Sequence, residues 1–136
     1  LKEIVFSDND IYSSLSFFII LNENLIINKK EKLDLFEHII KNNSFNNEIK
    51  DLIIFKKALY ESDFIQELDL VNALNPILNS DSIWKPHALL LLGDYFYSKN
   101  EYNKAKEFYS KILELKNIND TFYNQSKSQL TLMMND

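Results

Sequence analysis

The stretch from Ser82 to Asn117 constrains the fold most strongly, because it has the pattern of two amphipathic helices joined by a short polar turn. Apolar residues recur every three or four positions before and after Lys99-Asn100-Glu101, which is the spacing of a helix with one buried face. They are Leu89, Leu92, Gly93 and Phe96, then Tyr102, Ala105, Phe108, Tyr109 and Ile112. So short a turn makes the two helices antiparallel. We predict a helical hairpin in which the small residues Gly93 and Ala105 face each other.

The rest of the composition favours an all-α fold. The chain of 136 residues contains one Gly and two Pro, too few for the tight turns that join strands. Its 46% hydrophobic residues supply a core and exclude a disordered chain. The length fits a single domain over residues 1–136.

Further helices are predicted from the same periodicity. Residues 1–6 have the pattern of the end of a helix, and residues 17–21 are apolar on every side of the next one. We expect side chains such as Phe17 and Ile20 to lie in water unless residues 1–6 or a second copy cover them. Ser62-Asp63 is a helix-capping signal, and Pro76 should end or kink the helix that follows it. The predicted helices are Ile11 to about Ile27, Glu31 to about Lys41, Glu48 to Tyr60, a helix from the Ser62-Asp63 cap to Pro76, the hairpin, and Thr121 to about Met133.

The hairpin resembles the roughly 34-residue tetratricopeptide repeat. With Pro86 as the first position, the apolar and small residues of both helices match the repeat, whereas Ile112 stands at a small position and Asn117 at the terminal proline position. The entry Trp84-Lys85-Pro86-His87-Ala88-Leu89 and the preceding Leu74-Asn75-Pro76-Ile77-Leu78 are similar to the tetratricopeptide-like domain of a membrane-anchored bacterial family, which includes the ancillary subunit of the Sec translocon and its alphaproteobacterial relatives. An ordinary helical hairpin in a bundle is the alternative.

The resemblance implies a right-handed superhelix of about three antiparallel hairpins plus a C-terminal capping helix, a solenoid. It also implies a fragment that lacks an upstream anchor in the inner membrane, with this domain in the periplasm. Alignment to the repeat gives the positions that would line a concave groove for an extended or helical peptide. In this sequence they are His87, Leu90, Asp94, Tyr97 and Ser98, with Ile19 and Glu23 in the first repeat.

The residues for catalysis are missing from the sequence. There is no Cys, and one Gly cannot build a phosphate-binding loop. His38 has no second His one turn away, so no zinc motif arises, and His87 in a first helical turn can cap the helix or face solvent. The net charge of −5, with Lys as the only basic residue type, speaks against nucleic-acid binding. We expect no enzyme, cofactor or metal site.

Two functions remain. The first is a protein–protein interaction scaffold, for which the resemblance implies a role in envelope protein translocation or folding. The second is a structural module that self-associates, for example as a homodimer through its N-terminal helices.

Overall fold

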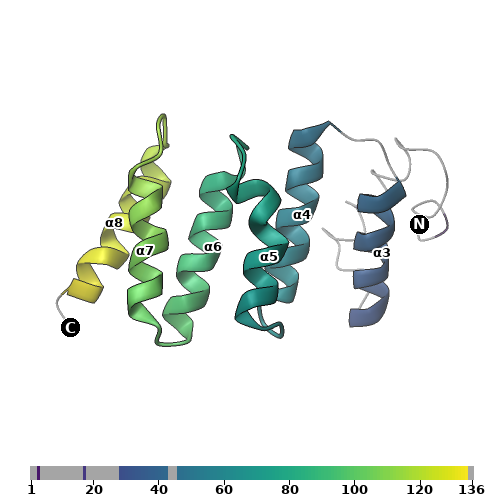
Figure 1. The fold of residues 1–136 in the computed structure, drawn as a ribbon, viewed down its shortest axis with the longest axis horizontal. Coiled ribbons are helices and arrows are strands. Elements are labelled where there is room, and N and C mark those ends of the chain that lie inside the picture. The colour runs from purple at the N-terminus through teal and green to yellow at the C-terminus, as the bar shows by residue number, and fades with distance from the viewer. Residues whose placement is uncertain (1–2, 4–16, 18–27, 43–45, 135–136) are drawn as a thin grey trace. The chain divides into compact units, whose positions relative to one another are not determined.

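The computed structural model describes residues 3, 17, 28–42 and 46–134. Within these ranges the chain forms six helices and no strand, which confirms the all-α prediction (Figure 1). The helices are α3 (Lys29–Asn42), α4 (Asn47–Glu61), α5 (Glu67–Leu78), α6 (Lys85–Ser98), α7 (Tyr102–Leu113) and α8 (Asp120–Met134). The chain divides into two compact units, residues 1–57 and residues 58–136. None of the helices in the described part of the chain has the length and apolar character needed to span a membrane.

Asparagine side chains start α3 and α4. The Oδ1 atom of Asn28 accepts hydrogen bonds from the backbone N–H groups of Lys30 (2.8 Å) and Glu31 (3.2 Å) at the start of α3. Asn46 does the same for Ile49 (2.9 Å) at the start of α4. Each asparagine thereby satisfies amide groups that have no partner inside the first turn of a helix.

Phe17 is fully buried in this unit, with its ring 4.9 Å from that of Phe36 in an edge-to-face arrangement. Phe17 therefore does not lie in water, and Phe36 of α3 supplies one apolar partner from within the same chain. The expected cover by residues 1–6 falls, apart from Glu3, on residues outside those described. The core face of α3 is formed by Leu35, Phe36 and Ile39, which are all buried. Ile20, the segment 1–6 apart from Glu3 and the remainder of the predicted helix over 11–27 lie outside the described residues.

The capping role predicted for Ser62-Asp63 is wrong. Ser62 donates its hydroxyl hydrogen bond back to the carbonyl of Leu59 (2.7 Å), at the end of α4. The backbone N–H groups of Phe64 and Ile65 both bond to the carbonyl of Glu61, so residues 62–65 are a turn. A serine hydroxyl can close a helix as well as open one, and α5 begins later, at Glu67.

Pro76 lies inside α5 and does not end it. The helix continues to Leu78, because Leu74 and Ile77 on either side of the proline are both fully buried. Their burial stabilises the last turn against the loss of one backbone hydrogen bond at the proline. The Asn79 amide then closes the helix on the carbonyl of Asn75 (2.9 Å).

The predicted hairpin is confirmed as α6 and α7. Its turn has the hydrogen bonds of a Schellman motif: the amide of Glu101 bonds to the carbonyl of Phe96 (2.9 Å), and that of Asn100 to Tyr97 (3.0 Å). Asn100 adopts a φ of 63°, the left-handed region that this motif requires. Asparagine tolerates that region better than other residues with a side chain, so the turn forms without glycine.

The closest contact inside the hairpin differs from the prediction. A Cβ atom built on Gly93 would lie 2.6 Å from Cε1 of Tyr109. The ring of Tyr109, and not Ala105, therefore fills the space opposite Gly93. Ala105 is fully buried at its own place in α7. Sequence spacing placed both small residues at the interface but could not show which side chain uses the space each one leaves.

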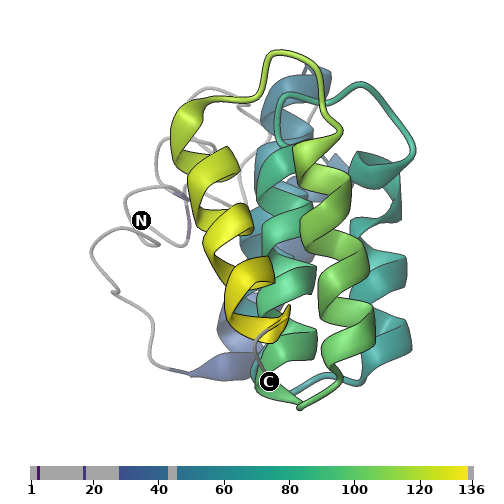
Figure 2. The same ribbon diagram turned by 90° about the vertical axis from the view of Figure 1, so that its left-hand side faces the viewer.

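Within residues 58–136, α6 is the central helix. It contacts α5, α7 and α8, and α8 packs on both α6 and α7. Figure 2 shows α7 and α8 side by side with α6 behind them. On α8, Met133 is buried and Phe122 and Leu130 are half-buried, whereas Leu132 and Met134 are exposed. This successive packing of helices is consistent with a helical repeat.

Two polar links join α6 and α7 to the start of α5. The Tyr95 hydroxyl donates to the carbonyl of Ile65 (3.2 Å), and Lys104 Nζ lies 2.6 Å from carboxylate oxygens of both Glu67 and Glu101. Hydrogen bonds to Glu101 and Glu67 raise the pKa of Lys104. Through Lys104, the two carboxylates connect the start of α5 to the turn of the hairpin.

Candidate partner-binding surface

Five of the predicted groove residues lie on one face of α6, and we call them the α6 stripe: His87, Leu90, Asp94, Tyr97 and Ser98. The helix places them together because its other face is committed to the core. The buried residues of that other face are Ala88, Leu89, Leu92, Gly93, Tyr95 and Phe96. Asp94 and Ser98 are exposed, and the remaining stripe residues are half-buried. Ile19 and Glu23 lie outside the described residues.

Asp94 is held in place from the neighbouring helix. The hydroxyl of Tyr109 in α7 donates a 2.5 Å hydrogen bond to Oδ1 of Asp94. Burial, reinforced by the bond to the Asp94 carboxylate, raises the pKa of Tyr109 well above its usual range. The phenol is therefore a permanent donor at neutral pH, and it orients an exposed carboxylate on the stripe.

The C-terminal part of the stripe offers an aromatic surface. The ring of Tyr97 lies 5.4 Å from that of Tyr102, at the start of α7, in an edge-to-face arrangement. Ser98 donates its hydroxyl to the carbonyl of Tyr95 (2.7 Å), so this hydroxyl serves the end of α6. A partner on the stripe would therefore meet Leu90, Tyr97 and the carboxylate of Asp94, and Ser98 would contribute little as a donor.

His87 packs between two aromatic rings. Its imidazole lies 4.8 Å from the ring of Trp84 and 4.6 Å from that of Phe122 in α8. Burial lowers the pKa of His87. The expectation that the imidazole caps the helix or faces solvent is replaced by a packing role, in which the neutral ring joins α6 to α8.

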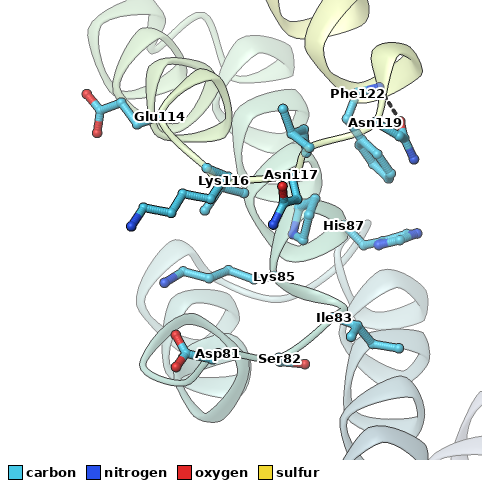
Figure 3. A pocket seen from close by; sticks show the side chains of 13 residues that line it. Asp81, Ser82, Ile83, Lys85, His87, Glu114, Lys116, Asn117, Asn119 and Phe122 are labelled. Atoms are coloured by element: carbon cyan, nitrogen blue, oxygen red, sulfur yellow. Dashed lines mark hydrogen bonds between the residues drawn. The ribbon is translucent and has the colours of Figure 1, made fainter.

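A cleft of about 850 Å³ opens beside His87, between the α5–α6 loop and the α7–α8 loop (Figure 3). Its charged lining residues are Asp81, Lys85, Glu114 and Lys116, and its apolar or aromatic ones include Ile83, His87, Ile118 and Phe122. The cleft could not be predicted from the sequence because its two loops are about thirty residues apart in the chain. The signals that were present are the polar segment 79–82 and the Asn- and Lys-containing segment 114–119, which come shortly before the starts of α6 and α8.

In the part of the chain that the structure describes, no group of three or more His, Asp or Glu residues could hold a metal ion. His38, the other histidine considered from the sequence, is half-buried on α3. The stripe and the cleft combine an oriented carboxylate, aromatic rings and lysines. Aromatic rings are enriched at protein–protein interfaces, whereas lysines and carboxylates are depleted in their buried core.

Comparison of the chain with protein-family models, with curated proteins and with solved structures finds no match.

Proposed function

We propose that this chain is a non-catalytic protein–protein interaction scaffold of the tetratricopeptide-like solenoid type, and that the α6 stripe contacts a peptide or a partner domain. One observation carries the proposal. The central helix of residues 58–136 contacts three others, yet it keeps an accessible face on which Tyr109 orients the carboxylate of Asp94 beside apolar and aromatic side chains. Such a rigid, pre-oriented surface lowers the entropic cost of binding.

The chemistry of the stripe favours a partner with an apolar anchor and a basic group. Leu90 and Tyr97 offer half-buried apolar area, and Asp94 presents an exposed acceptor between them. The net charge of −5 supports attraction of basic segments over acidic polymers. The proposal includes anchoring at the bacterial inner membrane with the domain in the periplasm, and the sequence resemblance is its only support.

Site-specific photocrosslinking in the source cell tests the proposal. A benzoylphenylalanine at the position of Leu90 or Tyr97 should give a discrete adduct with another protein. The same group at the position of Glu107, whose side chain is 60% exposed on α7, serves as the matched control and should give none. Adducts at all three positions, or at none, would reject the α6 stripe as a binding surface.

Self-association is the second candidate, and a specific observation favours it. Leu132 and Met134 at the end of α8 are 56% and 77% exposed, which is large for apolar side chains on one short segment. In the crosslinking experiment, an adduct identified by mass spectrometry as a second copy of the same chain would favour this function. Cell fractionation of the complete gene product tests the proposed membrane location.

A further inference from the structure

The cleft beside His87 has two walls of different chemistry (Figure 3). Lys85 and Lys116 extend toward one side, with Asp81 and Glu114 beyond them. Neither lysine has an ion-pair partner among the described residues, in contrast to Lys104, which contacts two carboxylates at 2.6 Å. Two ammonium groups that line one cleft and have no ion-pair partner among the described residues create a local site for an anion.

The other wall is apolar. The ring of Phe122 stands edge-on to His87, and Ile83 is 56% exposed at the same opening. A half-buried imidazole whose pKa burial lowers adds an uncharged aromatic surface there. An apolar side chain placed against this wall would remove Phe122 and Ile83 from water, which is favourable.

We infer that the cleft binds a peptide segment in which one acidic side chain adjoins an apolar one. The carboxylate lies between Lys85 and Lys116, and the apolar side chain packs on Phe122 and His87. A volume of about 850 Å³ lies within the range of pockets that enclose small ligands or a few residues. The inference rests on the proposed scaffold function and names the chemistry of a partner at a place other than the middle of the α6 stripe.

The carboxylates of Asp81 and Glu114, which also line the cleft, limit which anions can bind there. Asp81 and Glu114 would repel a nucleic acid or a run of acidic residues, whereas a single carboxylate fits between the lysines. A C-terminal carboxylate is usually held by a cluster of backbone N–H groups. Here Pro86 stands in the first turn of α6 and has no N–H. The side-chain lysines therefore favour an internal Asp or Glu.

The test uses the chain's single tryptophan, whose ring lies 4.8 Å from His87, as a reporter at the cleft. The indole N–H signal of Trp84 is followed by NMR during titration with an acetylated, amidated hexapeptide of sequence Ser-Leu-Glu-Phe-Gly-Ser. The matched peptide has Gln in place of Glu. We expect the Glu peptide to bind more tightly, with an affinity that falls as salt is added.

The double variant Lys85→Gln/Lys116→Gln should weaken binding of the Glu peptide about three- to twentyfold, to the level of the Gln peptide. The control Lys99→Gln/Lys106→Gln removes the same charge away from the cleft and should leave the affinity unchanged. Urea unfolding of each variant confirms that it is folded.

Equal affinity of the unmodified chain for both peptides, or an unchanged affinity in the Lys85→Gln/Lys116→Gln variant, would overturn the inference. Binding of both peptides that is lost in Leu90→Ala/Tyr97→Ala alone would overturn it too, but would leave the proposed scaffold function standing. If no peptide binds but photocrosslinks form at the α6 stripe, the inference about the cleft fails and the proposed scaffold function stands.

Discussion

The ring of Tyr109 lies against Gly93, so close that a Cβ atom at Gly93 would come within 2.6 Å of the ring. This contact sets the separation of α6 and α7. Tyr109 is fully buried and its hydroxyl is bonded to Asp94, so the ring cannot move aside without losing that bond. The only glycine of the chain is thus required for space, in a helix that glycine itself destabilises.

Gly93→Ala should destabilise the protein. Alanine gains about 1 kcal/mol of helix propensity over glycine, but overpacking a tight interface costs about 1–3 kcal/mol. Because the ring is held, we expect a net loss of about 1–2 kcal/mol in the free energy of unfolding, measured by urea denaturation. Gly93→Ala should cost less stability in a Tyr109→Leu background than in the unmodified protein, because the ring that it meets is then absent. Additive effects in this double-mutant cycle would contradict the direct contact.

The Tyr109–Asp94 hydrogen bond should make the stability of the protein depend on pH in the alkaline range. The folded state raises the pKa of Tyr109 above its ordinary value of 10.0, so the unfolded chain releases this proton first as the pH rises. The contribution to stability is therefore complete below about pH 10 and is lost above it. Tyr109→Phe should lower stability at pH 7 by about 0.5–3 kcal/mol. The difference in the free energy of unfolding between Tyr109→Phe and the unmodified protein should become smaller between about pH 9 and pH 11, as measured by urea unfolding at each pH. A constant difference would contradict the bond.

Asn117 offers a test of the loop between α7 and α8. Its φ is 57°, so the proline that a tetratricopeptide repeat carries at this position cannot be accommodated here. Asn117→Pro should lower the melting temperature strongly, by the equivalent of about 3 kcal/mol or more. Asn117→Gly should leave it unchanged or raise it slightly, because glycine enters the left-handed region without steric cost. Tolerance of proline would show that the loop adopts a different conformation.

Lys104→Gln tests the link between α5 and the hairpin turn. The ion pairs with Glu67 and Glu101 are exposed to solvent, so we expect a small loss of stability that is smaller than the loss in Gly93→Ala. The loss should shrink as salt is added, since salt screens exposed charges. Thermal unfolding at low and high salt measures both effects, with Lys106→Gln as the control for the change in net charge. A loss that salt does not alter would point to packing by the lysine stem instead.

The helical character of the chain could be predicted from periodicity because burial of one face per helix leaves a mark at every turn. Local hydrogen bonding leaves a weaker mark. Serine occurs at both the start and the end of helices, and only the structure shows that Ser62 closes α4. Pro76 likewise ends many helices, but here the burial of Ile77 outweighs its cost.

The candidate surface was only partly predictable. The α6 stripe follows from spacing within one helix, so its members could be named in advance. The cleft beside His87 depends on two loops that approach each other through the packing of α6 against α8, and the contact between His87 and Phe122 that closes it spans 35 residues. No local pattern encodes such a contact.

The central position of α6 has a consequence for hydrogen exchange. A helix that contacts α5, α7 and α8 cannot open unless those contacts break, so its amide protons should exchange only when residues 58–136 unfold as a whole. The amides of α8, at the edge of this unit, can exchange through local fraying. A ligand seated on the α6 stripe would therefore slow exchange throughout the unit by mass action, whereas a ligand confined to α8 would protect that helix alone.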